Sequence, residues 1–301
     1  MTFKSIFILV LKYLALVVVY VLVSSLSSVV LPARLLMNVP GDSASTYHIL
    51  LCSLLVAAVN TLIITVVILR SRWSGWKLML GLSAAYYGLV TIMSQMETGY
   101  FADALGVDGN TLVRLFLAGL PVALLFIPLA VWVLGKARST AVDMPLTTIL
   151  PADAKEWMWK LGSIAVLYVV VYFTFGFFVA WQNPNLVSMY DTVSHPHIFN
   201  NARLVPFQLM RGVLWGLLAV LCLHILRGGR LEKAALVGIL FAVPMSIGLI
   251  FPNNPFMPDA SVRMSHLVEL LSSNSLFGVL VVAILTYHSG ALREKPANQP
   301  G

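Results

Sequence analysis

The side chains best able to do chemistry lie within long apolar stretches of the sequence. Arg263, His266 and Glu269 follow one another at three-residue spacing, which places them roughly along one face of a helix. Gln208 and Arg211 have the same spacing on an earlier stretch. Because a charged group inside a membrane costs at least about 2.5–3.5 kcal/mol on insertion scales, we expect these side chains to face neighbouring helices and to form pairs.

Two more charged residues indicate which pairs would form. Glu97 closes one apolar stretch, and Arg114 lies close to the start of the next. The most economical pairing joins Arg211 to Glu269 and Arg114 to Glu97, because each cation then gains one acid. The sequence therefore predicts two buried ion pairs in the same half of the molecule.

Three hypotheses account for this polar cluster. In the first it is structural, and buried ion pairs hold the helices in register. In the second it lines a pocket for a polar, anionic or lipid-like ligand, because arginine binds carboxylates and phosphates well. The residues of this ligand site would be Glu97, Arg114, Gln208, Arg211, Arg263 and Asn274. In the third, the protein is an intramembrane enzyme in which His266 or Glu269 acts as a base or metal ligand.

The pocket is the hypothesis that we favour. Arg211 and Arg263 would hold the anionic part of the ligand, and Glu97, His266 and Glu269 would balance the charge. The pocket would open to the external side between the third, fourth, sixth and eighth apolar stretches. Such a pocket would suit a transporter or a lipid-binding protein. The sequence does not indicate the identity of the ligand, a cofactor or a partner subunit.

A histidine pair elsewhere in the chain could bind a metal. His195 and His197 are separated by one residue and follow Asp191. Zinc needs a third protein ligand, and none is evident nearby, so a solvated loop is the favoured interpretation. The sequence also lacks a glycine-rich phosphate loop and a Gly-x-Ser-x-Gly elbow, and thus gives no support to ATP-driven or conventional serine-hydrolase chemistry.

Eight long apolar stretches must position these side chains. Each is roughly 18–26 residues long, about the length that a helix needs to cross 30 Å of hydrocarbon. Apart from a closed barrel, only a helix satisfies its backbone polar groups in lipid, so the sequence predicts an all-α, polytopic membrane protein. The predicted spans cover residues 6–31, 48–69, 78–96, 112–134, 161–181, 204–226, 234–251 and 267–287.

The basic residues predict how these spans are oriented. With the N-terminus in the cytoplasm, 14 of the 19 Lys and Arg residues fall on cytoplasmic segments. This bias follows the positive-inside rule and predicts a protein of the cytoplasmic (inner) membrane with both termini, including a tail at 291–301, in the cytoplasm. The net charge of +7 would then face anionic lipid headgroups, and it is no evidence for nucleic-acid binding.

The single domain 1–301 contains a weak sign of internal duplication. The dipeptide Leu-Arg at 69–70 recurs at 226–227, in each case at the end of an apolar stretch and before a basic turn. Because four is an even number of spans, halves at 1–150 and 151–290 would share one orientation, as parallel repeats do. Basic turns of this kind are common in membrane proteins, so chance similarity is the alternative.

The orientation can be tested by cysteine accessibility. In a cysteine-free background, single cysteines in place of Asp108 and Asn253 should react with a membrane-impermeant thiol reagent in intact cells, because the positive-inside rule places them outside. Cysteines in place of Arg138 and Arg230 should stay unlabelled. Labelling at position 138 or 230 would overturn the orientation.

Overall fold

The computed structural model describes residues 3–32, 35, 46–138, 154–191, 202–252 and 254–287. Within these ranges the chain is helical apart from turns and one isolated antiparallel bridge. Eight helical segments are long and apolar enough to cross a membrane, which confirms the predicted multi-pass membrane protein. These segments are Phe3–Val30, Tyr47–Leu69, Gly75–Tyr100, Gly109–Val133, Ala154–Gln182, Leu204–Ile225, Arg230–Ile250 and Ala260–Leu285.

Three of the first four spans are divided into shorter helices. The first joins α1 (Phe3–Ser25) to α2 (Ser27–Val30), and the second is α4 (Thr46–Leu69). The third consists of α5 (Gly75–Tyr86), a π-helix (Tyr87–Ile92) and α6 (Met93–Tyr100). The fourth consists of α7 (Gly109–Ala118), a second π-helix (Val122–Phe126) and α8 (Ile127–Val133).

The last four spans are dominated by one long helix each. They are α9 (Ala154–Phe178), α11 (Leu204–Ile225), α12 (Arg230–Ser246) and α13 (Ala260–Leu285). A 3-10 turn (Ala180–Gln182) follows α9, and another (Ile247–Ile250) follows α12. The short helix α10 (Pro184–Tyr190), which the sequence did not predict, lies beyond the end of α9.

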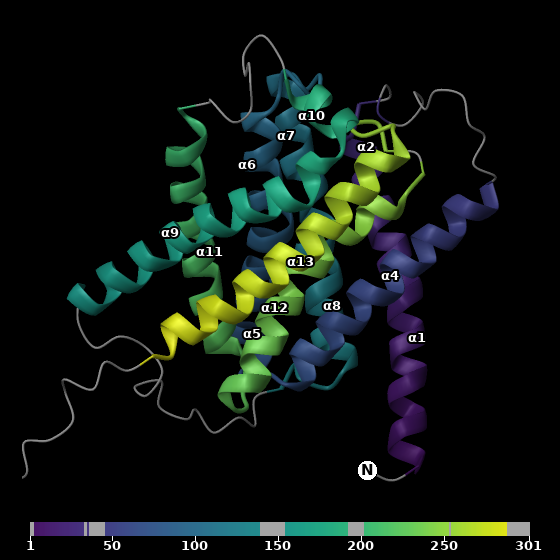
Figure 1. Ribbon diagram of the computed structural model, residues 1–301. Coiled ribbons are helices and arrows are strands. Elements are labelled where there is room, and N and C mark those ends of the chain that lie inside the picture. Colours follow the sequence, from purple (N-terminus) through teal and green to yellow (C-terminus); the bar gives the residue numbers. More distant parts are fainter. Residues whose placement is uncertain are drawn as a thin grey trace, which may run out of the picture.

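Two helices that border the candidate site, α9 and α13, pack against each other and cross the bundle obliquely (Figure 1). A buried lysine fixes one end of this pair. The Nζ of Lys160 on α9 lies 2.7 Å from Oε1 of Glu156 and donates to the carbonyl of Leu285 on α13 at 2.9 Å. The side chain of Lys160 is only 1% exposed, so a buried polar contact joins α9 to α13 here.

Glycines allow the site-bearing helices to approach their neighbours closely. A Cβ atom on Gly278 of α13 would lie 2.8 Å from the Cα of Gly238 on α12. A Cβ atom on Gly212 of α11 would lie 2.7 Å from the Cα of Ala165 on α9. Such contacts are favoured between membrane helices, where lipid removes the hydrophobic drive for association. They fix the rotation of α11 and α13 about their own axes.

The two basic connections that contain the Leu-Arg dipeptide contact each other. The isolated antiparallel bridge joins them, and on either side of it the N–H of Arg72 donates to the carbonyl of Ile225 and the N–H of Arg227 to that of Arg70, both at 2.9 Å. Next to this bridge, α4 packs against α12 and α5 packs against α11. In the hairpins α4–α5 and α11–α12, the first helix of each thus packs against the second helix of the other.

The close contact between α12 and α13 predicts a difference between two glycine substitutions. Gly278→Ala should lower the free energy of unfolding by about 1–3 kcal/mol, because the new methyl group meets backbone atoms that cannot rotate away. Gly162→Ala on α9 is the control, because a Cβ there meets nothing within 4 Å. Equal melting temperatures of the two variants in one detergent would contradict the packing.

Candidate functional site

The candidate site begins with a face of α11 that is buried although it carries polar side chains. Gln208, Arg211 and Trp215 lie about one turn apart along this face, and each exposes at most 1% of its surface. The face with Gly212 and Gly216 packs against α9. This packing directs the side chain of Arg211 towards α6.

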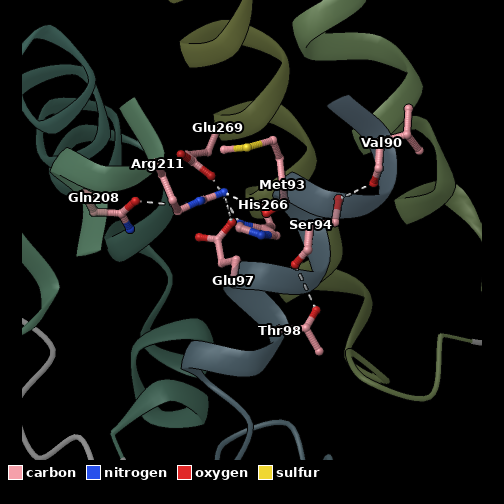
Figure 2. A network of polar contacts seen from close by, with 9 residues as sticks. All are labelled: Val90, Met93, Ser94, Glu97, Thr98, Gln208, Arg211, His266 and Glu269. Atoms are coloured by element: carbon pink, nitrogen blue, oxygen red, sulfur yellow. Dashed lines mark hydrogen bonds and ion pairs between the residues drawn. The ribbon is translucent and has the colours of Figure 1, made fainter. Parts of the chain in front are cut away.

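Arg211 forms three polar contacts in the interior (Figure 2). Its Nη2 lies 2.9 Å from Oε2 of Glu97 on α6 and donates to the carbonyl of Met93 at 3.2 Å. Its Nη1 donates to Oε1 of Gln208 at 3.0 Å. Hydrogen bonds between charged groups are roughly twice as strong as neutral ones, so this contact is a major link between α11 and α6.

His266 and Glu269 on α13 complete the polar cluster. The Nδ1 of His266 lies 3.2 Å from Oε2 of Glu269, within ion-pair distance although not aligned as a hydrogen bond. Figure 2 shows both side chains beside Arg211 and Glu97. The cluster therefore contains one guanidinium, two carboxylates and one imidazole. Its charge is net negative when the imidazole is neutral and balanced when the imidazole is protonated.

Two cavities border this cluster. The first offers about 30 Å³ that water can enter and lies between α6, α9, α10 and α13. The second offers about 170 Å³ and lies between α6, the end of α12 and the start of α13. Both are lined by Glu97, Phe101, Tyr190, His266 and Leu270. The two cavities therefore adjoin each other at these residues.

Aromatic side chains form much of the wall of the first cavity. They come from the end of α6, from the fifth span and from α10, and they are Phe101, Tyr168, Tyr172, Trp181 and Tyr190. Tyr190 lies outside the spanning segments. Burial and then the carboxylates of Glu97 and Glu269 raise the pKa of Tyr190, so its phenol stays protonated. The two carboxylates thus make the electrostatic potential at this wall more negative.

Several buried N–H groups near the cavities lack a hydrogen-bond partner among the residues that the structure describes. They are Nε2 of Gln208, Nε of Arg211 and Nδ2 of Asn274. Asn274 is 4% exposed and lines the first cavity. An unsatisfied buried donor costs about 1–3 kcal/mol, so an acceptor from water or a ligand would stabilise this site.

The structure corrects the predicted ion pair between Arg211 and Glu269. Arg211 pairs with Glu97 instead, and Glu269 lies beside His266. Arg211, Glu97, His266 and Glu269 lie at similar depth along their helices, and the sequence predicts this depth. The choice of partner depends on the rotation of each helix, which the glycine contacts determine.

The predicted pair of Arg114 with Glu97 is also wrong. Arg114 on α7 donates to the backbone carbonyl of Val30 at 3.3 Å and to Oδ1 of Asn110 at 3.4 Å. These contacts join α7 to α2, and Arg114 lines neither cavity. Its role in ligand binding finds no support in this geometry.

Arg263 points away from the position that an anionic ligand would need. Its Nη1 donates to the carbonyls of Met257 and Pro258, at 2.9 and 2.5 Å, and so holds the turn that precedes α13. Arg263 lines neither cavity, whereas Met257 lines the second. Arg263 therefore shapes the cavity wall through the backbone and does not present its charge to the cavity.

The walls of the cavities come partly from spans that the sequence did not implicate. The third and eighth spans contribute as predicted, but the fourth does not, and the sixth supplies Arg211 behind Glu97. The fifth span and α10 provide most of the aromatic wall instead. The spacing of Tyr168 and Tyr172, one helical turn apart, was the available signal for this face.

Within the described ranges, no three His, Cys, Asp or Glu side chains come together as metal ligands. His195 and His197 lie outside the described residues, so the hypothesis about them stays a prediction.

The pairing of Arg211 with Glu97 predicts a specific pattern of stabilities. Arg211→Met leaves the carboxylate of Glu97 uncompensated and should lower the free energy of unfolding by about 3–5 kcal/mol. Adding Glu97→Leu should recover most of this loss in thermal unfolding. Adding Glu269→Leu to Arg211→Met is the matched control, because it removes the pair that the sequence predicted. Recovery in that control alone would show that Glu97 is not the partner.

Eight apolar helices of spanning length make the chain a multi-pass membrane protein with a polar cluster inside the bundle. Comparison with protein-family models, with curated proteins and with solved structures finds no match.

Proposed function

We propose that the protein is a carrier that binds a small polar ligand in the two cavities beside Glu97 and His266. The observation that supports this most strongly is a polar, partly unpartnered cluster that adjoins open space within an apolar bundle. Ionisable side chains inside membrane spans are costly, and they commonly mark substrate or ion pathways.

A purely structural role would require fewer polar groups. Arg211 and Glu97 compensate each other and could join α11 to α6 by themselves. Glu269 and His266 add a second ionisable pair beside a cavity, and Asn274 adds a donor without an acceptor. Apolar residues of similar size would often stabilise such a helix contact at least as well. The surplus of polar groups therefore supports ligand binding over a scaffold.

The volume of the larger cavity limits the size of the ligand. Water can enter about 170 Å³ there. An apolar cavity of about 150 Å³ holds one benzene molecule, so a ligand of roughly six to eight heavy atoms would fit. A whole lipid would not fit, although its headgroup would.

The packing of the spans supports a carrier with two four-helix halves. Parallel repeats are related by an axis along the membrane normal, and such an axis would exchange α4 with α11 and α5 with α12. The crossed contacts of α4 with α12 and α5 with α11 agree with this relation. The ion pair between Arg211 and Glu97 would then join the halves at the end that contains the cavities.

We place the cavities on the external side of a cytoplasmic (inner) membrane. Figure 1 shows α6 and α10 at the end of the bundle opposite the start of α1. The basic turns between α4 and α5 and between α11 and α12 lie at the end where α1 starts, and the positive-inside rule assigns that end to the cytoplasm. The ligand would therefore enter from outside.

A binding screen tests this proposal. Purified protein is mixed with small cations, anions and neutral polyols of about six to eight heavy atoms, and the melting temperature is followed. A ligand at 100 times its Kd should add about 2.7 kcal/mol to the free energy of unfolding. Asn274→Ala should weaken the effect, whereas Asn110→Ala, outside the cavities, should not. The proposal fails if no compound stabilises the protein, or if both variants respond like the parent.

A further inference from the structure

We infer that the ligand is a small hydroxyalkylammonium cation, and that its binding displaces a proton from His266. This inference rests on the proposed function, because it assigns a ligand class and a coupled ion to the same site. It reverses the charge that the two arginines of the sequence led us to expect.

The charges that face the cavities are negative. Glu97 lines both cavities and Glu269 lines the first, whereas neither Arg211 nor Arg263 lines either one. Arg211 is 1% exposed behind Glu97, and the guanidinium of Arg263 is directed to backbone carbonyls. An anion in the first cavity would meet two carboxylates before any guanidinium. A cation would meet them directly.

The aromatic side chains that line the cavities suit an ammonium group. A cation within about 6 Å of an aromatic face is attracted to it, and quaternary ammonium groups are commonly bound in aromatic cages. Arg211 already uses this attraction, because its guanidinium carbon lies 5.5 Å from the ring centre of Tyr168. Phe101 and Tyr190 line both cavities and Phe256 lines the second, so these rings lie where an ammonium group would fit.

The unpartnered amide of Asn274 indicates a second feature of the ligand. Its Nδ2 is buried beside the first cavity and needs an acceptor. A hydroxyl oxygen two carbons from an ammonium nitrogen would supply one while the nitrogen lies beside Glu97, which lines both cavities. Choline has seven heavy atoms and this arrangement, and because the first cavity holds only about 30 Å³, its hydroxyl would lie there and its trimethylammonium group in the adjoining second cavity of about 170 Å³.

Charge balance couples this cation to a proton. Arg211 contributes one positive charge, and Glu97 and Glu269 contribute two negative charges, so the empty cluster is balanced when His266 is protonated. A bound cation supplies the same charge. Holding both would leave an uncompensated positive charge in a low-dielectric site. Binding therefore exchanges one ligand cation for one proton, which leaves the imidazole for bulk solvent.

The surroundings of His266 contain the groups that this exchange requires. Glu269 belongs to the same helix, and Glu97 faces it from α6 with Arg211 of α11 behind. The phenols of Tyr172 and Tyr190 line the first cavity from the fifth span and α10. Asn254, Phe256 and the end of α12 line the second cavity and add no charge. His266 thus lies beside two carboxylates, Glu97 and Glu269, and lines both cavities.

The test measures choline binding and proton release together. Choline chloride is titrated into purified protein in weak buffer between about pH 5 and 9, with a pH indicator and the melting temperature as readouts. Where the imidazole is protonated, each bound choline should release about one proton, and the apparent Kd should rise by about tenfold for each unit of acidification. The neutral carbon isostere 3,3-dimethylbutan-1-ol should neither bind comparably nor release protons.

Variants separate the cation from the proton. Glu269→Gln should weaken choline binding at least about tenfold, because the cluster that balances the ammonium charge loses one negative charge. His266→Asn should bind choline without proton release, and His224→Asn, near the opposite end of α11, should behave like the parent. If His266→Asn does not fold, the pH dependence of the parent protein alone decides the exchange.

Each outcome has a distinct meaning. Equal binding of the neutral isostere, or preference for an anion, overturns the cation while the proposed pocket stands. Choline binding without proton release at every pH overturns the exchange. Failure of every compound in the screen removes the pocket itself. In a separate arm, competition by phosphatidylcholine vesicles identifies a lipid headgroup as the source of the cation, and its absence identifies the free ion; both support the shared chemistry.

Discussion

The guanidinium of Arg211 imposes the strictest constraint on this bundle. It is 1% exposed, among helices whose other faces are apolar, and a buried charge of this kind persists only when it is paired and hydrogen-bonded. Glu97, Met93 and Gln208 meet that requirement. Because these partners lie on two different spans, the need to compensate one charge determines how α11 and α6 face each other.

The spans themselves could be predicted from the sequence, but the starting points of the fifth and eighth could not. Hydropathy places the fifth and eighth spans at 161 and 267, whereas the helices begin at Ala154 and Ala260. Polar first turns explain both extensions. Glu156 pairs with Lys160 within the first turns of α9, and Asp259 caps α13 by accepting the N–H of Ser261 at 2.6 Å. Hydropathy therefore locates the apolar part of each of these helices and misses the polar turns that precede it.

The sequence predicted which residues gather in the candidate site more reliably than which partners they contact. Sequence spacing placed Arg211, Glu97, His266 and Glu269 at similar depth, and the structure gathers these four. It could not reveal that the guanidinium of Arg263 is used by the backbone of the preceding turn. An arginine that the sequence suggests for ligand binding can instead donate its hydrogen bonds to neighbouring backbone carbonyls. The sign of the charge that faces the pocket then changes.

The alignment of Glu97 with Arg211 depends on the length of the chain as well as on its residues. In the π-helix Tyr87–Ile92, the N–H of Met93 bonds to the carbonyl of Gly88, five residues earlier, so this turn holds one residue more than an α-helical turn. One residue corresponds to about 100° of helix rotation. Loss of a single codon within this turn would therefore swing the acid away from its cation while leaving every charged residue in the protein.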